Sequence, residues 1–463
     1  MAERLDNHRG PWADVVVDLG RCLDPARVST APAHLDAASR DESSLPPARP
    51  DVVVWPESTE EVAAVVSLAV RRRIPVTPRG AGSSLEGNPI PVAGGIVLDL
   101  TRMNRVLAIR GGDLQVDVQP GVVYDALNRS LRPHGLFFPP SPGGSSDVAT
   151  IGGMAANDAS GIYTVKYGAT RAHVLAATVV TGSAAVLSLG SRCRKSSSGY
   201  HLIGLLVGSE GTLAVATELT LSLAGLPQAR RQGGFTFVAE TNAVRAVADL
   251  IRYGIDVAAL EFLDARTLAA LNAFGEFGLT ERPSLLVEVH GSTSVVDETW
   301  QAAETVCREA GGVPLAIPGG RDAWDVRRHV TRAIQARHPG AKIVRTDLVV
   351  PISALPTLVS DAHRIAVGAG LPLYTFGHAG VGIVHALMPA DAADSERWQL
   401  VESVRHRLVD AALGLGGSVS GEHGIGLGNK AYMAAEHGAA LDLMRGVKTV
   451  FDPGGVLNPG KIW

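Results

Sequence analysis

The sequence contains only three cysteines, at positions 22, 193 and 307, and their spacing is not that of a metal site. An odd number of unpaired thiols does not indicate a disulfide framework, so we expect free thiols in a reducing compartment. The formal net charge is −4, and the chain has no basic stripe and no block of like charge. A nucleic-acid partner is therefore not indicated.

Long hydrophobic runs are also missing. No stretch approaches the roughly 20 apolar residues that a membrane-spanning helix needs, because Gly, Ser or Thr interrupts every apolar run. The N-terminal MAERLDNHRGPWADVVVDLG carries charges where a signal peptide requires an apolar core. We expect a cytoplasmic protein, and the sequence leaves a peripheral contact with the inner membrane open.

What is present is enough length and hydrophobicity for more than one core. With 463 residues, of which 46% are hydrophobic, two or three globular domains are expected. We divide the chain into an N-terminal arm (1–47), a first domain (48–225), a second domain (226–415) and a C-terminal segment (416–463). The stretch SRDESSLPPARP is typical of a linker, so regular structure is expected to begin at Asp51.

The first domain opens with a predicted β-α-β unit. A β-branched strand over 51–55 precedes Ser58 and Glu61, which form a capping box at the start of a helix. A second strand over 74–77 follows. From about residue 226, strands such as GGFTFVA and SLLVEVHG alternate with helices, which indicates a second domain of βαβ type.

Two glycine-rich segments, PRGAGSSLEG (78–87) and PPSPGGSSDVATIGGMAANDASG (139–161), stand out. The first is not a dinucleotide fingerprint of the G-x-G-x-x-G type, because its third glycine, Gly87, comes too late and no amphipathic helix follows. Successive backbone N–H groups in such loops can nevertheless bind an anion. Two such loops suit an extended dinucleotide better than a single phosphate.

With KYG (166–168) and GLLVGSEGTLAV (204–215), these segments resemble the FAD-binding domain of the vanillyl-alcohol-oxidase flavoprotein superfamily. The similarity is greatest to the branch with D-lactate dehydrogenase, glycolate oxidase and D-2-hydroxyglutarate dehydrogenase, and it covers about residues 48–463. It implies an α+β fold: a two-part FAD-binding domain, an α+β substrate (cap) domain, and a C-terminal segment that returns to the FAD site.

The same resemblance implies a set of FAD-binding residues. Flavinylated relatives carry a His in these loops, whereas Ala81 and Ser83 stand here, so non-covalent FAD is expected. Lys461 is an additional candidate beside the C-terminal Asn458. The full set is Pro78, Arg79, Gly80, Ala81, Gly82, Ser83, Ser84, Gly87, Pro140, Ser141, Ser145, Thr150, Gly152, Gly153, Asn157, Gly161, Glu210, Gly211 and Asn458.

A second group of residues suggests chemistry at a metal. TFGHAGVGIVHALM places His378 and His385 seven positions apart, and SGEHGIGLGNK places Glu422 next to His423. Two imidazoles and a carboxylate suit Zn²⁺, Mn²⁺ or Fe²⁺. The residues alone do not show that the two segments meet.

The resemblance supplies that connection, because the segments are similar to the family motifs GHxGDGNxH and GEHG. It implies that His378, His385 and Glu422 bind a divalent metal, Zn or Mn, and that His423 is the general base. A 2-hydroxy acid can chelate such a metal, which lowers the pKa of its hydroxyl group. The family's Asp and Asn are replaced by Val381 and Ile383, which makes the pocket more apolar and puts the metal site and the substrate preference in doubt.

Cationic residues for the substrate carboxylate are expected in WDVRRHVTRAIQARHPGAKIVRTDLVVP. The resemblance places Arg327, Thr331 and Arg345 at anion-binding positions. A guanidinium group matches a carboxylate well.

The sequence therefore predicts an FAD-dependent dehydrogenase that oxidises a small D-2-hydroxy acid by hydride transfer to the flavin. Two alternatives stay open: a flavin-binding subunit of a multi-subunit glycolate oxidase, and a non-redox flavoenzyme that resembles alkyl-dihydroxyacetone-phosphate synthase. The expected electron acceptor is a quinone, a cytochrome or an electron-transfer flavoprotein. A homodimer or a subunit of a complex are both compatible with the sequence.

Overall fold

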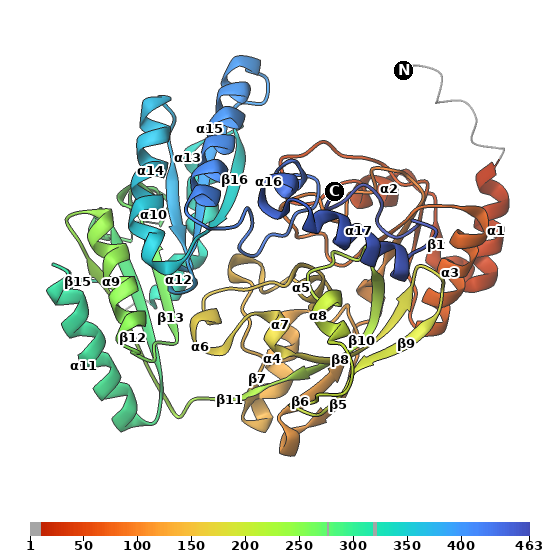
Figure 1. Ribbon diagram of the computed structural model, residues 1–463, viewed down its shortest axis with the longest axis horizontal. Coiled ribbons are helices and arrows are strands. Elements are labelled where there is room, and N and C mark those ends of the chain that lie inside the picture. The colour runs from red at the N-terminus through yellow and green to blue at the C-terminus, as the bar shows by residue number, and fades with distance from the viewer. Residues whose placement is uncertain (1–10, 276, 318–321) are drawn as a thin grey trace.

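The computed structural model describes residues 11–275, 277–317 and 322–463. Figure 1 shows an N-terminal half that carries two sheets and a second half built on one large sheet. Helices α16 (Met433–His437) and α17 (Ala440–Phe451) return from the second half to lie beside the N-terminal elements. In the described residues, no helix is long and apolar enough to cross a membrane.

The first sheet has the strand order β1-β2-β4-β3. β1 (Val28–Ser29) is antiparallel to β2 (Val52–Val54), whereas β2, β4 (Ile96–Asp99) and β3 (Val76–Arg79) are parallel. Helix α3 (Thr59–Arg72) connects β2 to β3, and Ser58 Oγ accepts a hydrogen bond from the Glu61 amide at 3.2 Å. The predicted β-α-β unit and its cap are confirmed, although β4 lies between the two strands.

The N-terminal residues are part of this first core. Helix α1 (Pro11–Cys22) packs on α3, and η1 (Pro25–Arg27) and α2 (Pro32–Ala38) follow. Val15, Leu19 and Leu23 recur every four residues and are buried with the residues of β2 and α3. The prediction that regular structure begins at Asp51 is therefore wrong for the described part of the arm, because this helical stripe was overlooked. Residues 1–10 of the arm lie outside the described residues.

The segment predicted as a linker is also held in place, between the two halves. Asp41 accepts hydrogen bonds from Ser84 Oγ (2.7 Å) and from the Gly87 amide (2.8 Å) on the glycine-rich loop. On the other side, Lys342 Nζ donates to the Ser44 carbonyl at 3.0 Å. The polar groups of this segment make these contacts, so the segment is not a free linker.

The second sheet is antiparallel, in the order β5-β6-β10-β8-β9. Short helices and a two-stranded ribbon cover it and enclose a core around Val116, Leu127 and Val179. The strands are β5 (Val106–Arg110), β6 (Gln115–Val118), β8 (Val174–Thr181), β9 (Val186–Gly190) and β10 (Ala214–Ser222), with the ribbon β7 (Leu136–Phe137) and β11 (Ala224–Gly225). The helices are α4 (Tyr124–Leu131), α5 (Ile151–Asn157), α6 (Thr164–Tyr167), α7 (Thr170–His173) and α8 (Leu202–Leu206).

The second half is a seven-stranded sheet in the order β15-β12-β14-β13-β17-β18-β16. Its strands are β12 (Ala229–Thr236), β13 (Ala259–Leu263), β14 (Ser284–Gly291), β15 (Val313–Pro314), β16 (Lys342–Val349), β17 (Tyr374–Gly377) and β18 (Ile383–Ala390). Helices α9 (Glu240–Arg252), α11 (Thr293–Glu309), α14 (Leu355–Gly368) and α15 (Ser395–Gly414) pack on one face. Helices α10 (Ala265–Gly275), α12 (Ala323–Arg328) and α13 (Val330–Arg337) pack on the other.

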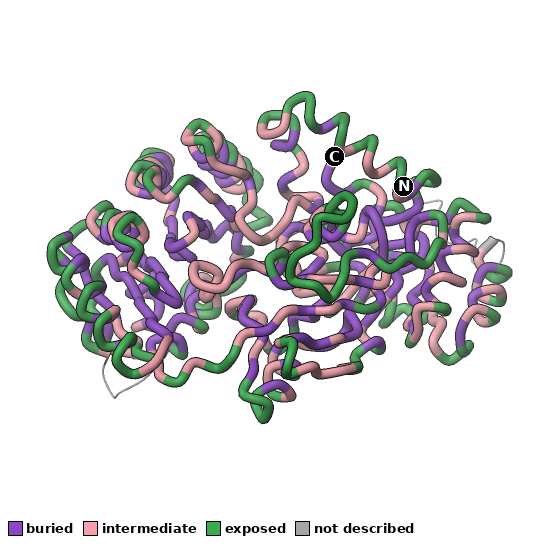
Figure 2. The backbone as a smooth tube through the Cα atoms, turned by 60° about the horizontal axis from the view of Figure 1, so that its bottom comes forward, coloured by how far each residue is buried: buried purple, intermediate pink, exposed green. Residues whose placement is uncertain are grey.

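Because both faces are covered, the central strands are buried along their whole length, and Figure 2 shows this buried layer. Every neighbouring pair in the sheet is antiparallel. β12 and β13 are both antiparallel to β14, which lies between them, so β12, α9 and β13 form a split βαβ unit rather than one with adjacent parallel strands. The α+β fold class, with a two-part N-terminal half and an α+β second half, is confirmed.

The burial of α1 predicts a measurable role in stability. Leu19→Ala should lower the free energy of unfolding by about 2–5 kcal/mol, because it leaves a cavity in the core where Leu19 is fully buried. Val17→Ala on the exposed face of the same helix is the matched control. Chemical denaturation monitored by circular dichroism measures both, and equal stabilities of the two variants would contradict the assignment of α1 to the core.

Candidate active site

A cavity lies between the glycine-rich loop after β3, helix α5 and the segment that carries His423. Its lining includes residues of both glycine-rich segments, and Glu422 and His423 lie on its wall as well. The predicted FAD residues on this wall are Pro78, Arg79, Gly80, Ala81, Gly82, Ser83, Ser84, Ser145, Thr150, Gly152, Gly153, Asn157, Glu210 and Gly211.

Glycine is required at two points of this wall. A Cβ atom at Gly80 would lie 2.3 Å from Thr150 Oγ1, and one at Gly152 would lie 2.5 Å from Pro120 Cβ. The Thr150 hydroxyl also accepts from the Gly153 amide at 3.3 Å at the start of α5. The two glycine-rich segments therefore pack against each other, as a shared cradle for an extended ligand would require.

Arg79 supplies a positive charge to this cradle. Burial lowers the pKa of its guanidinium group, and Nη1 is buried without a hydrogen-bond partner in the structure. Nη2 donates to the Ala37 carbonyl at 3.2 Å, so Nη1 is the nitrogen that an anion would satisfy, since a buried donor without a partner is costly. The FAD pyrophosphate fits this position.

Five of the predicted FAD residues do not line the cavity: Gly87, Pro140, Ser141, Gly161 and Asn458. A Cβ at Gly161 would collide with the Ser141 carbonyl, so this pair forms a close packing contact. Asn458 is buried, and its amide donates to the carbonyls of Asn88 (3.0 Å) and Glu210 (2.7 Å). Lys461 donates to the Ile90 carbonyl at 2.6 Å. These residues support the wall rather than reach the cavity.

The structure brings His378, His385 and Glu422 together. His378 follows β17, His385 lies on β18, and Glu422 lies on the loop after α15. Glu422 Oε1 is 3.2 Å from His378 Nε2 and 3.4 Å from His385 Nε2, so the three side chains converge as a metal triad would. Ser160 Oγ donates to the other Glu422 oxygen at 2.9 Å.

Both imidazoles have a carboxylate on their outer nitrogen. His378 Nδ1 forms a hydrogen bond with the buried Glu261 on β13, and His385 Nδ1 lies 3.2 Å from Asp347 Oδ1 on β16 at ion-pair distance, without hydrogen-bond geometry. This arrangement points both Nε2 atoms inward and is the usual support of metal-bound histidines. Burial alone would lower the pKa of His378, but Glu261 and Glu422 raise it to about 10. The two carboxylates therefore stabilise positive charge at this position, whether it is carried by a proton on His378 or by a metal cation.

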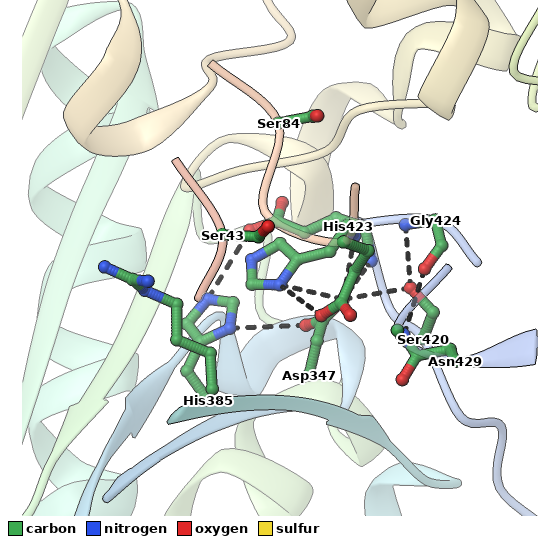
Figure 3. A network of polar contacts seen from close by, with 12 residues as sticks. Ser43, Ser84, Asp347, His385, Ser420, His423, Gly424 and Asn429 are labelled. Atoms are coloured by element: carbon green, nitrogen blue, oxygen red, sulfur yellow. Dashed lines mark hydrogen bonds and ion pairs between the residues drawn. The ribbon is translucent and has the colours of Figure 1, made fainter. Parts of the chain in front are cut away.

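Asp347 also holds the loop that carries Glu422 and His423. Its Oδ2 accepts from the backbone amides of Gly421 (2.9 Å), Glu422 (2.7 Å) and His423 (2.8 Å), and from Ser420 Oγ (3.2 Å). Figure 3 shows this carboxylate between His385, His423 and Ser420. Burial alone would raise the pKa of Asp347, but the imidazoles and the amides hold it far below the usual range.

Glu210 holds the next part of the same loop from the N-terminal half. Its carboxylate accepts from the amides of Ile425 (2.6 Å) and Gly426 (2.9 Å) and from Asn88 Nδ2 (2.7 Å). Burial raises the pKa of Glu210, and these donors partly offset that effect. The carboxylate of Glu210 is therefore engaged by the loop, while the residue also lines the cavity, and its contact with the nucleotide stays a prediction.

His423 lies on the cavity wall beside the triad. Its ring stacks on His385 with centroids 5.3 Å apart and planes 2° apart. Its Nδ1 is buried without a hydrogen bond, 3.9 Å from both Asp347 and Glu86. Burial lowers the pKa of His423, and Asp347 partly opposes this. The ring is therefore neutral near pH 7 and able to accept a proton.

The three predicted substrate residues do not share one pocket. Arg327 is buried, donates from Nε to Glu261 at 2.6 Å, and lies 4.7 Å over the Phe376 ring. Arg327 lines a small cavity with Tyr163 and Trp324, whereas Arg345 lines another with Glu86 and Arg405. Thr331 on α13 is half-buried and lines neither cavity.

Sequence reasoning missed Glu261, Asp347 and Ser160. A possible signal was a lone acidic residue inside an apolar strand, as in ALEFL for Glu261 and RTDLVV for Asp347. Such a carboxylate is rarely buried unless it has partners.

Comparison with known proteins gives matches over almost the whole chain. Residues 50–190 match the family described as "FAD binding domain", and residues 226–462 match "FAD linked oxidases, C-terminal domain". The chain is 36% identical to the probable mitochondrial D-lactate dehydrogenase of Danio rerio, over 94% of this chain and 88% of that protein. It is 32% identical to glycolate oxidase subunit GlcD of Bacillus subtilis, over 89% of each.

Solved structures share the fold at low identity. p-Cresol methylhydroxylase with bound substrate has a TM-score of 0.83 at 16% identity, over 97% of this chain and 96% of that chain. Alkyldihydroxyacetonephosphate synthase has a TM-score of 0.78 at 20% identity, over 98% of this chain and 86% of that chain. At these identities the likeness concerns the fold alone.

The contacts of Asp347 generate a prediction. Asp347→Asn should lower the free energy of unfolding by about 3 kcal/mol, because charge-assisted hydrogen bonds to buried amides are lost. Asp442→Asn, at an exposed ion pair with Arg445, is the control and should change stability little. Urea denaturation compares the two, and a wild-type midpoint for Asp347→Asn would refute this role.

Proposed function

This chain belongs to the FAD-linked oxidases, and on that premise we propose that it dehydrogenates a small D-2-hydroxy acid to the 2-oxo acid. As a member of the branch with D-lactate dehydrogenases and glycolate oxidase subunits, it is a flavoprotein oxidoreductase that acts on the CH–OH group of hydroxy acids. The proposed substrates are of the D-lactate, glycolate or D-2-hydroxyglutarate type. The proposed cofactors are non-covalent FAD and a divalent metal, Zn or Mn.

One observation carries the proposal. The cavity that Arg79 to Ser84 line also contacts Glu422 and His423, and Glu422 converges with His378 and His385. A group bound in the glycine-rich cradle and a substrate at the triad would therefore share one cavity. This is the arrangement that transfer between a cofactor and a 2-hydroxy acid requires.

When bound, FAD supplies the hydride acceptor, and a metal held by His378, His385 and Glu422 supplies a Lewis acid for the substrate hydroxyl. The neutral His423 accepts the hydroxyl proton. Its Nδ1 edge faces Asp347 and Glu86, which leaves Nε2 for the proton. The Asp347 carboxylate then stabilises the imidazolium ion across 3.9 Å.

Arg345 is the better candidate to bind the substrate carboxylate. Its Nη1 donates only to the backbone carbonyls of Glu42 and Ile343, each at 3.4 Å, so its charge is not engaged by a carboxylate hydrogen bond. Arg327 instead pairs with Glu261, which contacts His378. We assign Arg327 a positioning role: it holds the carboxylate that orients a proposed metal ligand.

The apolar replacements in the GHAGVGIVH motif bear on substrate choice. Ile383 is buried and packs directly over Gly421, where a Cβ atom would lie 2.7 Å from its Cγ1. An apolar side chain therefore stands next to the residue that precedes Glu422. Because it offers no hydrogen bond, it favours smaller or more apolar hydroxy acids over those with a second polar end.

A second candidate follows from the similarity to glycolate oxidase subunit GlcD. The chain would then be the flavin-binding subunit of a larger enzyme and would reduce its flavin without rapid turnover on its own. Steady-state turnover of the isolated chain with an artificial electron acceptor distinguishes this case from an independent dehydrogenase.

The His423 assignment predicts a large kinetic effect. The purified protein should be yellow, and a D- but not an L-2-hydroxy acid should bleach the flavin without oxygen. His423→Ala should slow bleaching by about 10²–10⁴-fold while the flavin stays bound, whereas His437→Ala on α16 is the control.

The pH dependence gives a further readout of the same prediction. Because the pKa of His423 is lowered, the base stays neutral to below its usual value of about 6.5. The bleaching rate should therefore be flat near neutrality and fall only in more acidic buffer. Bleaching of His423→Ala at the wild-type rate would refute the assignment of the base.

The triad predicts a dependence on metal. Exhaustive chelation should remove one class of bound divalent ion and abolish bleaching, and added Zn²⁺ or Mn²⁺ should restore it. Glu422→Gln should lose the ion in elemental analysis, whereas Glu298→Gln, on the exposed face of α11, should keep it. Full activity after the metal is gone would show that the triad works without one.

A further inference from the structure

The segment from β9 to α8 carries an unusual amount of exposed apolar surface. Val186 and Leu187 on β9, and Leu202 and Leu205 on α8, are each more than one-third exposed, and Tyr200 between them is 95% exposed. Single exposed hydrophobic residues are ordinary, but a cluster within twenty positions of chain is not. We call these residues, with the loop that joins them, the β9–α8 surface.

The same loop is basic. Arg192, Arg194 and Lys195 are exposed in it. Arg192 pairs with Asp113 at 2.7 Å, whereas the described part of the chain places no carboxylate within 4.0 Å of Arg194 or Lys195. The protein as a whole has a net charge of −4, so this positive charge is a local feature of the surface.

The surface lies over the proposed cofactor cavity. On α8, Ile203 and Leu206 point inward, and Leu206 lines the cavity together with Ser209 and Glu210. Leu202 and Leu205 of the same helix are more than one-third exposed. The helix packs against β8 and β9 (Figure 1), so the exposed side chains stand on a fixed support. One short helix, α8, therefore contributes both to the cavity wall and to the exposed surface.

We propose that the β9–α8 surface docks the protein on an anionic phospholipid bilayer. Exposed aliphatic and aromatic side chains enter the headgroup region, and adjacent Lys and Arg side chains bind the acidic headgroups. No membrane-spanning helix is needed for this mode of binding. Docking in this orientation brings the cavity wall at Leu206 close to the bilayer. The proposal goes beyond the proposed dehydrogenation and depends on none of its steps.

Vesicle co-sedimentation of the holoprotein tests the charges. The wild type should bind vesicles that contain phosphatidylglycerol and not vesicles of phosphatidylcholine alone, and added salt should release it. Arg194→Glu/Lys195→Glu should weaken binding about tenfold or more. Arg252→Glu/Arg445→Glu, which reverses two exposed charges elsewhere, is the matched control and should bind within about twofold of wild type.

A second pair of variants tests the apolar part. Tyr200→Ser/Leu205→Ser should also reduce binding, whereas Leu443→Ser/Val450→Ser, at exposed positions of α17, should not. A polarity-sensitive dye on Cys193, which is exposed in the basic loop, should shift to the blue on anionic vesicles. The same dye at Ser294→Cys on α11, in a Cys193→Ser background, should not shift.

Several results would overturn the proposal. These are no binding of the wild type to any vesicle, equal binding to phosphatidylcholine, and equal losses in test and control variants. A wild-type dimer that becomes monomeric in Tyr200→Ser/Leu205→Ser would assign the surface to a second copy of the chain instead. Flavin bleaching in vesicle-free solution is measured in parallel and should match wild type in the test variants. A failure of the proposed dehydrogenation is thereby distinguished from a failure of docking.

Discussion

Two buried carboxylates that hold one loop are the constraint on which the site depends. Asp347, from the large sheet, accepts hydrogen bonds from the backbone amides of residues 421–423. Glu210, from the N-terminal half, accepts hydrogen bonds from the amides of residues 425 and 426. The remaining amide, of Gly424, donates to Ser420 Oγ. Every N–H group from 421 to 426 thus has a partner, as a largely half-buried loop between two packed halves requires. If either carboxylate were lost, several buried donors would be left unpaired, at a cost of about 1–3 kcal/mol each.

Because the two carboxylates come from different halves, the loop also sets how the halves meet. Asn157 of the glycine-rich segment donates to the His423 carbonyl, and Ser160 donates to Glu422. Glu86 and Arg405 form a further buried pair between the halves. Polar contacts of this kind have strict geometry, whereas hydrophobic burial has little. The position of His423 relative to the cofactor cavity is therefore determined by hydrogen bonds rather than by core packing.

Part of this arrangement was predictable from the sequence. The β-α-β unit, the α+β class and the cavity wall at Arg79 to Ser84 follow from local pattern or from motif resemblance. The antiparallel direction of neighbouring strands in the large sheet could not be predicted from the sequence. A strand that is buried on both faces has the same hydrophobic periodicity and composition in a parallel pair as in an antiparallel pair. Asp347 and Glu261 were missed because each is a single acidic residue in an apolar strand, and its partners lie many residues away in the chain. No local rule relates such residues.

The support of the triad also explains how the motif can lose its polar residues. Val381 and Ile383 stand where the family has Asp and Asn, and the expectation was a weakened metal shell. In the structure the partners of His378 and His385 are Glu261 on β13 and Asp347 on β16, neither of which belongs to the motif. Glu422 likewise accepts a hydrogen bond from Ser160, which lies in the segment that joins α5 to α6. The groups that orient the three proposed ligands are thus independent of positions 381 and 383. A change at those positions alters the lining of the pocket while the charge and geometry of the triad remain, so substrate preference can diverge without loss of the reaction.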